Sequence, residues 1–232
     1  MLAAMTATTW DEVGGWPKVL GTLTQRGDLD RSIAGLAMGE ILDGNATPVQ
    51  IAGFIIALRM KGETTEELIG LVNAMLDRSV RVELEDPEGV IDLVGTGGDR
   101  SHSINVSTLA ALTVVGAGGR VCKHGNRAAS SKSGAADVLA ELGVPTSLEP
   151  DAVAHCLDTL GITFLHAARH HGAMARVAGV RKALGRRTIF NLLGPLANPA
   201  GVSFQLIGVA DPRWLRPFAE VLRELGAKRA MI

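Results

Sequence analysis

The sequence predicts an α/β protein with a small N-terminal all-helical domain and a larger α/β domain built on a mainly parallel central sheet. Apolar residues recur at helical spacing through about the first eighty residues. From Val90 onward, short apolar strands alternate with helical segments, which is typical of a parallel sheet. Glycine-rich stretches follow the first two of these strands, as expected where the carboxyl ends of parallel strands form a ligand site.

In the helical part, caps and glycines mark the ends of the helices. Residues 47–50 (TPVQ) fit a capping box with proline at the first helical position, and residues 64–67 (TTEE) offer a second box. Gly44 and Gly62 stand where helices should stop. We therefore expect helices on both sides of each glycine.

The α/β part has five candidate strands and five candidate helices. We expect the domain limits to be 1–82 and 83–232, with the acidic segment 83–88 as the linker and with helices from about 168–195 joining the helical domain. The expected strands are 90–94, 120–122, 162–165, 204–209 and 229–232, and the expected helices are 107–115, 134–142, 151–160, 173–184 and 212–225.

Composition excludes several classes of protein. The chain has 232 residues, 47% of them hydrophobic, which suits a folded core, and its formal charge of -1 provides no field to attract nucleic acid or an anionic membrane. Cys122 and Cys156 lie too far apart for a disulfide framework or a CxxC motif, which favours a reducing, cytoplasmic location. The N-terminus has no basic region, and its apolar stretch is too short and too interrupted for a signal peptide. The longest weakly polar stretch, 104–119, is too short to span a membrane.

Two glycine-containing loops carry the functional signal. Residues 95–99 (GTGGD) directly follow a strand, where glycine lets the backbone approach a phosphate closely, although an ordinary turn is the alternative. Arg100 stands where a dinucleotide fingerprint needs glycine or alanine, and there is no Walker A motif. Residues 123–134 combine Lys123, His124, Arg127 and Lys132 with three hydroxyls, which suits a polyanion, whereas a solvated basic loop is the alternative.

Between these loops, residues 101–108 (SHSINVST) either cap a helix or hold phosphate and metal, and the residues leave both possibilities open. Two successive glycine-containing loops of this kind predict a diphosphate site.

His166 and His170 stand four residues apart, but Ala167 takes the place of the glutamate of a zinc-protease helix, so we expect no metal there. Cys122 is predicted to be a buried apolar residue.

Together these motifs resemble the anthranilate phosphoribosyltransferase family over nearly the whole chain. The resemblance implies transfer of the phosphoribosyl group from phosphoribosyl diphosphate to anthranilate in tryptophan biosynthesis, with Mg²⁺ as cofactor and a homodimer formed through the helical domain. The motifs are TPVQIAGF (47–54), ALRMKGET (57–64), GTGGD (95–99), NVST (105–108), KHGNRAASSKSGAADVL (123–139) and TIFNLLGPL (188–196).

The resemblance also implies roles for individual residues. Anthranilate would contact Gly95, Asn126 and Arg181, the last in the matching string VRK (180–182). Ser107 would bind Mg²⁺ and Lys123 would act electrostatically on the leaving diphosphate, with no residue assigned as acid or base. Phosphoribosyl diphosphate would be bound by Gly95, Gly98, Asp99, Ser103, Asn105, Val106, Ser107, Thr108, Lys123, His124, Gly125, Asn126, Arg127, Ala128, Ala129, Ser130, Ser131 and Ala135.

The chain departs from the family pattern in three places. Gly172 stands where the family usually has proline, and 164–168 (FLHAA) replaces an apolar or proline-containing stretch. After the strand matched by 229–232 the family continues with a turn and a magnesium-binding Asp-Glu pair, so we expect a truncated sheet and half a metal site. The alternatives are a non-catalytic phosphate-binding or dimerisation relative and a pyrimidine nucleoside phosphorylase.

Overall fold

The structure, a computed structural model, describes residues 9–98, 104–127 and 133–232. The chain divides into two compact units, a helical unit of residues 1–77 and 173–189, and an α/β unit of residues 78–172 and 190–232. These limits differ by a few residues from the predicted 1–82 and 83–232. The difference arises because Val80 donates its N–H to His170 O (2.8 Å) and Val82 to Pro199 O (3.3 Å), so that both pair within the α/β unit.

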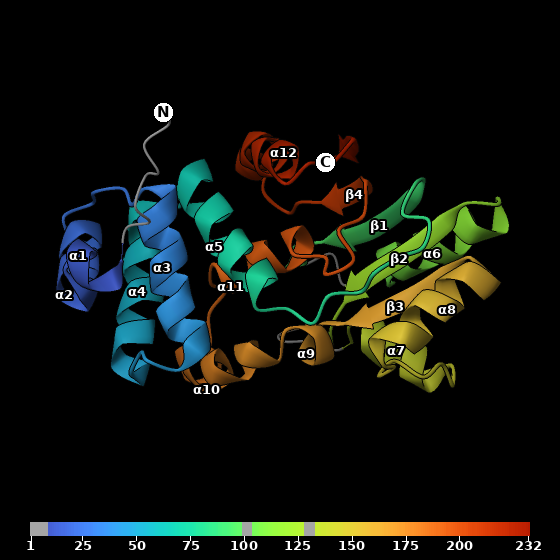
Figure 1. The fold of residues 1–232 in the computed structure, drawn as a ribbon, viewed down its shortest axis with the longest axis horizontal. Helices are drawn as coiled ribbons and strands as arrows, with labels where there is room; N and C mark the ends of the chain where they lie inside the picture. The colour runs from blue at the N-terminus through green and yellow to red at the C-terminus, as the bar shows by residue number, and fades with distance from the viewer. Residues whose placement is uncertain (1–8, 99–103, 128–132) are drawn as a thin grey trace, which may run out of the picture. The chain divides into compact units, whose positions relative to one another are not determined.

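The helical unit is built on α3 and α5, with α2, α4 and α10 packed in the same unit (Figure 1). Gly35 and Gly70 lie where α3 and α5 meet, and a Cβ on Gly70 would lie 2.1 Å from Arg31 O, so only glycine fits this contact.

Among the described residues, no helix of either unit is both long enough and apolar enough to cross a bilayer. The helices of the helical unit are α1 (Trp10–Val13), α2 (Gly15–Thr24), α3 (Arg31–Asp43), α4 (Pro48–Lys61), α5 (Thr65–Asp77) and α10 (Ala175–Leu184).

The predicted helix caps are confirmed. Thr47 and Gln50 form the capping box of α4, with Pro48 in its first turn. Thr64 N–H donates to Glu67 Oε2 (2.9 Å) and Glu67 N–H donates to Thr64 Oγ1 (3.2 Å), which forms the second box. Gly44 ends α3 with φ of 88°, and Gly62 follows the last residue of α4.

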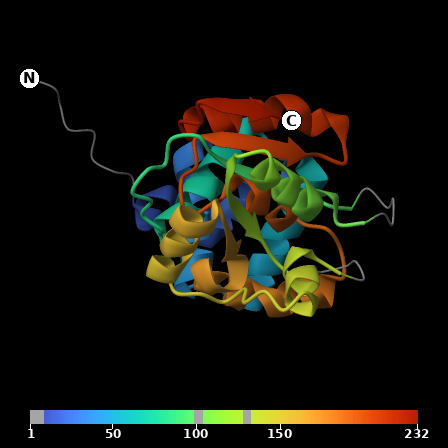
Figure 2. The same ribbon diagram turned by 90° about the vertical axis from the view of Figure 1, so that its right-hand side faces the viewer.

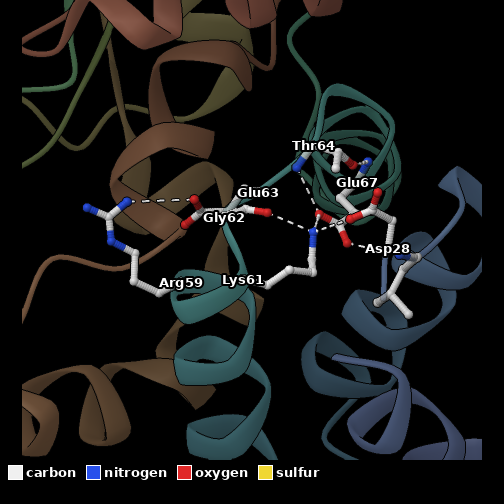
Figure 3. Close-up of polar contacts among 8 residues, drawn as sticks. Asp28, Arg59, Lys61, Gly62, Glu63, Thr64 and Glu67 are labelled. Carbon is white, nitrogen blue, oxygen red and sulfur yellow. Dashed lines mark hydrogen bonds and ion pairs between the residues drawn. The ribbon is translucent and has the colours of Figure 1, made fainter. Parts of the chain in front are cut away.

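A buried ion pair joins the turn between α4 and α5 to the segment before α3 (Figure 3). Lys61 Nζ donates to Glu67 Oε2 (3.0 Å), Asp28 Oδ1 (2.7 Å) and Gly62 O (2.7 Å), which uses all three of its protons. Glu67 also accepts the Leu29 N–H at 3.0 Å. The side chains of Lys61 and Glu67 are 4% and 0% exposed, so the Glu67 charge is compensated by Lys61, and the Lys61 charge by Glu67 together with Asp28.

The α/β unit contains a five-stranded, all-parallel sheet in the order β3-β2-β1-β4-β5, which confirms the predicted fold class. The short helix η1 (Gly172–Met174) contains a boundary between the two units along the sequence, because Gly172 belongs to the α/β unit and Ala173 to the helical unit. The other elements are β1 (Val90–Gly95), α6 (Val106–Gly116), β2 (Arg120–Gly125), α7 (Ala135–Glu141), α8 (Pro150–Leu160), β3 (Ile162–His166), α9 (Ala167–His170), α11 (Phe190–Leu193), η2 (Gly194–Leu196), β4 (Phe204–Gly208), η3 (Pro212–Trp214), α12 (Leu215–Glu224) and β5 (Arg229–Met231).

Helices cover both faces of this sheet (Figures 1 and 2). Ala111 of α6 packs with Leu93 and Val121 in one apolar cluster. Val153 of α8 packs with Cys122 in another cluster, on the opposite face, because successive residues of a strand point to opposite sides. Cys122 is fully buried, as predicted, and burial raises the pKa of its thiol.

Candidate functional site

The first glycine loop lies at the point where the order of the strands along the sheet reverses. From β1 the chain runs outward through β2 to β3, and then returns to the other side of β1 to form β4 and β5. In open parallel sheets, ligands bind in the crevice outside the carboxyl ends of the strands at such a switch point. The loop that leaves β1 after Gly95 lies at the carboxyl end of β1, next to β4.

The backbone of this loop is held against β4. Thr96 N–H donates to Gly208 O (2.9 Å), and Thr96 Oγ1 accepts the Ala210 N–H (3.2 Å). Gly97 and Gly98 have φ of 60° and 78°, in the left-handed region that side chains disfavour, and both are exposed. The loop therefore presents exposed backbone at the edge where open parallel sheets commonly bind ligands. Asp99 and Ser103 lie outside the described residues.

The amino end of α6 is capped by Asn105. Its Oδ1 accepts the Thr108 N–H (3.3 Å) and lies 3.4 Å from Ser107 Oγ. This favours the capping interpretation for Asn105, while the half-buried Ser107 hydroxyl also contacts Lys123. Val106 is exposed, and the buried Thr108 Oγ1 has no hydrogen-bond partner in the part of the chain that the structure describes. The first turn of an 11-residue helix here favours an anion nearby.

Lys123 and His124 do not lie in a basic loop, as the sequence had suggested. Strand β2 continues to Gly125, pairing with β3 through Gly125 and His166, and it buries both side chains. The charged residues seemed to end the strand because lysine and histidine are rarely buried without partners, and their partners come from distant parts of the chain.

The imidazole of His124 provides no positive charge near neutral pH. Its Nδ1 lies 3.1 Å from Gly194 O, and its ring centroid is 5.2 Å from that of His171. Burial, with the further effect of His171, lowers the pKa of His124 to about 3. Diphosphate attraction by His124 is therefore not supported, although its role as a substrate contact stays a prediction.

Lys123 connects β1 to α6. Its Nζ donates to Leu93 O (2.5 Å) and to Ser107 Oγ (3.1 Å), and the side chain is almost fully enclosed. Burial lowers the pKa of Lys123, and the negative charge of Asp92 opposes that shift. The lysine therefore lies next to the first turn of α6, where its charge can act on an anion bound at the sheet edge.

At the end of β2, Gly125 is tightly packed, whereas the two residues that follow it are exposed. A Cβ on Gly125 would lie 2.9 Å from Phe164 Cε2 and 3.3 Å from the Ala135 Cβ, so Gly125 and Ala135 meet at a tight contact. Asn126 and Arg127 are exposed, and Arg127 Nη1 lies 3.6 Å from Asp137 Oδ1. Ala128, Ala129, Ser130 and Ser131 lie outside the described residues.

Arg181, predicted to contact anthranilate, belongs to α10 of the helical unit. Its side chain is half-buried, and burial lowers the pKa of the guanidinium. Even a lowered pKa leaves arginine charged at neutral pH, so it remains suited to a carboxylate partner.

Two buried residues of this region were missed by the sequence analysis. Asp92 Oδ1 accepts the His124 N–H (3.0 Å), and Asp92 Oδ2 accepts an N–H of Asn198 Nδ2 (2.9 Å). Burial raises the pKa of Asp92 to about 6, against the opposing effects of Lys123 and these hydrogen bonds. The signal was a carboxylate in the middle of the apolar run VIDLV (90–94), because charges are almost never fully buried without a structural or functional reason.

The oxygen atoms around Ser107 are of the kind that Mg²⁺ prefers. Ser107 Oγ and Asn105 Oδ1 are hard ligands, and Mg²⁺ usually keeps several waters and binds substrate phosphates in addition to a few protein oxygens. The described residues contain no group of three or more His, Cys, Asp or Glu side chains that would hold a metal. The Ser107 and Asn105 oxygens therefore supply only part of the ligands of a magnesium site.

His170, which stands four residues after His166, has its Nδ1 at 2.9 Å from Val80 O.

Comparison with protein families gives two matches. Residues 17–79 match the helical bundle domain of a glycosyl transferase family, and residues 87–232 match the a/b domain of a glycosyl transferase family. Among curated relatives, the chain is similar to the anthranilate phosphoribosyltransferases of Methylobacterium radiotolerans (54% identity, 91% of this chain and 60% of the relative) and Sinorhizobium medicae (53%, 88% and 60%). The chain thus spans about 60% of the length of these relatives.

Solved structures show the same likeness. Anthranilate phosphoribosyltransferase from Thermus thermophilus superposes with a TM-score of 0.84 at 42% identity, covering 90% of this chain and 63% of that one. The enzyme from Saccharomyces cerevisiae in complex with PRPP and Mg superposes with a TM-score of 0.77 at 29% identity, covering 91% of this chain and 60% of that one.

Proposed function

This chain belongs to the glycosyl transferase family that combines a helical bundle domain with an α/β domain, and we propose that the full-length protein is an anthranilate phosphoribosyltransferase. The reaction would join phosphoribosyl diphosphate and anthranilate to give N-(5-phosphoribosyl)anthranilate and diphosphate, in tryptophan biosynthesis. The observation that carries this proposal is the glycine loop 95–98, with exposed backbone, at the switch point of the parallel sheet. The named relatives support the substrate assignment.

The diphosphate would be bound by backbone N–H groups and by cationic side chains. Backbone N–H groups of the loop after β1 and of the first turn of α6 would donate to phosphate oxygens. Lys123 would add a positive charge held in place by Leu93 O and Ser107 Oγ, and the exposed Arg127 would add a second. Asp99, Ser103 and residues 128–131 are proposed to complete the site on the resemblance alone.

Ser107 would hold Mg²⁺, which the Saccharomyces cerevisiae structure contains together with PRPP. When bound, Mg²⁺ would neutralise charge on the diphosphate oxygens. The chain's own residues would perform the rest of the catalysis by placing the amine of anthranilate opposite the departing diphosphate and by stabilising the negative charge that develops there. This displacement requires no covalent protein nucleophile.

An activity assay of the full-length protein tests the proposal. With phosphoribosyl diphosphate and Mg²⁺, the fluorescence of anthranilate should fall as product forms, and removing Mg²⁺ with a chelator should stop the change. A protein that leaves anthranilate unchanged under these conditions would contradict the proposal. Phosphorolysis of thymidine or uridine would instead identify a nucleoside phosphorylase. Binding of diphosphate without turnover would identify a non-catalytic relative.

Arg181 is proposed to bind the carboxylate of anthranilate through a bidentate pair. Arg181→Ala should raise the KM for anthranilate by about tenfold to a hundredfold, because hydrogen bonds to charged groups contribute roughly 1.5–3 kcal/mol. The KM for phosphoribosyl diphosphate should stay close to that of the wild type. Steady-state kinetics of the full-length protein provide both values.

Lys182→Ala is a matched control, because Lys182 is the next residue of the same helix and is exposed. It should leave both KM values unchanged. Equal increases in the two KM values for Arg181→Ala would refute the assigned role of Arg181.

We further propose a homodimer formed through the helical unit. On α4, Val49 and Met60 are 80% and 69% exposed, and Ile56 lies between them at helical spacing, so these apolar side chains form a stripe. Sedimentation of the full-length protein should show a dimer at micromolar concentration, and a monomer would contradict this proposal.

A cytoplasmic location is also proposed. It is supported by Cys122 and Cys156, which are both free thiols, as expected in a reducing compartment. Recovery of the protein from an oxidising compartment during cell fractionation would contradict this location.

A further inference from the structure

We propose that Asp92 and Asn198 form a buried positioning pair that holds Lys123 in place for diphosphate binding. Neither residue belongs to the motifs that the chain shares with the anthranilate phosphoribosyltransferase family. The proposal rests on the function proposed above, since it concerns how that diphosphate site is kept in shape.

The first observation is a gap in the centre of the sheet. The pairing of β1 with β2 covers only Val90 with Arg120 and Ile91 with Val121. On the outer sides pairing continues, from β1 to β4 as far as Gly95 with Gly208, and from β2 to β3 as far as Gly125 with His166. Strands β1 and β2 thus lose their regular ladder toward their carboxyl ends, at the edge that carries the proposed site.

Side chains take over the backbone groups that this gap leaves unpaired. The carboxylate of Asp92 accepts the His124 N–H at 3.0 Å, and Nζ of Lys123 donates to Leu93 O. Buried backbone groups need such partners, because an unpaired one costs about as much as a lost hydrogen bond. Asp92 and Lys123 reach the gap from opposite faces of the sheet, since they lie at alternating positions of paired strands.

Asn198 fixes the orientation of this carboxylate. Its Nδ2 donates to Asp92 Oδ2 (2.9 Å) and to Cys122 O (3.0 Å), and its Oδ1 accepts the Ala200 N–H (2.9 Å). Each polar atom of the amide is therefore used, and a flipped amide would place its NH₂ against the Ala200 N–H. These hydrogen bonds therefore fix one orientation of the Asn198 amide and one oxygen of the Asp92 carboxylate, while the other oxygen accepts the His124 N–H of β2.

Charge links the pair to Lys123. Asp92 is 0% exposed and Lys123 is 3% exposed, and the two side chains attract each other electrostatically. A buried charge left without its opposite is strongly unfavourable, so removal of the Asp92 charge would favour movement of the Lys123 ammonium toward water. Because Lys123 also donates to Ser107 Oγ, such a movement would disturb the first turn of α6 as well.

The first test measures the accessibility of Lys123 in the full-length protein. Asp92→Asn keeps the size of the side chain but removes its charge and places an NH₂ group against either the His124 N–H or the Asn198 NH₂, which are both donors. Acetylation of Lys123 by an amine-reactive reagent, followed by mass spectrometry, should become about tenfold faster, which corresponds to roughly 1.4 kcal/mol. Lys182, which is exposed on α10, is the internal reference.

Two further variants separate positioning from general loss of stability. Asn198→Ala removes the support of Asp92 while keeping the charge, and it should raise the Lys123 rate in the same direction by a smaller factor. Val153→Ala weakens the core of the same unit, against Cys122, without touching the gap, and it should leave the Lys123 rate unchanged. Circular dichroism verifies that each variant is folded. Equal Lys123 rates in Asp92→Asn and Val153→Ala would overturn the proposal.

The second test concerns the ligand. Calorimetric titration with inorganic diphosphate should show about a tenfold loss of affinity in Asp92→Asn and none in Val153→Ala. The KM for anthranilate should not change. Unchanged diphosphate affinity in Asp92→Asn would overturn the link to the site. A wild-type protein that binds diphosphate but leaves anthranilate unchanged would overturn only the proposed transferase activity.

Discussion

Replacing Gly98 with valine should strongly weaken the binding of phosphoribosyl diphosphate to the full-length protein. Gly98 has φ of 78°, where a side chain costs about 1–2 kcal/mol of backbone strain, and it is exposed at the switch point of the sheet. A valine side chain would also occupy the space in which a phosphate meets the loop backbone. Isothermal titration should show the dissociation constant rising by about a hundredfold or more, equivalent to roughly 2.8 kcal/mol.

Gly118→Val provides a control with a matching backbone. Gly118 has φ of 88° and is exposed, and a Cβ added to it would have no neighbouring atom within 4 Å, but it lies between α6 and β2, at the amino end of that strand. The Gly118→Val variant should therefore lose about as much folding stability as Gly98→Val and keep its affinity for phosphoribosyl diphosphate. If both variants bound the ligand equally, or lost binding equally, the loop after β1 would not be a specific ligand contact.

The parts of the fold that are determined by residues close together in the sequence could be predicted from the sequence. The capping box of α4 connects Thr47 with Gln50, three residues apart, and the stop at Gly44 depends on one positive φ. The apolar run at Val90 marks a buried strand for the same reason, since its pattern is contained in the segment itself. Such local signals also placed the glycine loop after β1.

The end of β2 could not be predicted in this way, because its partners are distant in the sequence. Lys123 contacts Leu93 and Ser107, which are 30 and 16 residues away, and His124 contacts Gly194, 70 residues away. A lysine and a histidine after a short apolar run therefore looked like the start of an exposed loop. Only the folded chain supplies the acceptors that make their burial favourable.

The candidate site divides in the same manner. The glycines of the proposed phosphate loop can be recognised in the sequence because they lie next to one another, whereas Asp92 and Asn198 are hydrogen-bonded across 106 residues. Neither residue belongs to a short motif with a known chemical role, so only the hydrogen bonds of the structure bring them together. The roles of Asp99, Ser103 and residues 128–131 stay predictions, since these residues lie outside the described part of the chain.

In the helical unit, Glu67→Ala should lower the free energy of unfolding by about 3 kcal/mol, because it breaks a buried ion pair from one side. Glu67 accepts hydrogen bonds from Lys61 Nζ (3.0 Å), Thr64 N–H (2.9 Å) and Leu29 N–H (3.0 Å), as Figure 3 shows around Lys61. Burial alone would lower the pKa of Lys61, but its hydrogen bonds to Asp28 and Glu67 outweigh that effect and raise it. Without Glu67, Lys61 would retain Asp28 as its only carboxylate in this network.

Urea denaturation provides the measurement, in a Trp214→Phe background, because Trp214 lies in the α/β unit whereas Trp10 and Trp16 lie in the helical unit and report on it. Glu66→Ala is the matched control, because Glu66 is the preceding residue of α5 and forms an ion pair with Arg31 in which both side chains are exposed. Exposed ion pairs contribute only about 0–1 kcal/mol, so this variant should unfold close to the wild-type midpoint. Equal midpoints for Glu67→Ala and Glu66→Ala would contradict the prediction. A shift confined to Glu67→Ala would follow from two N–H groups left without their acceptor and from a buried ammonium left with one carboxylate in place of two.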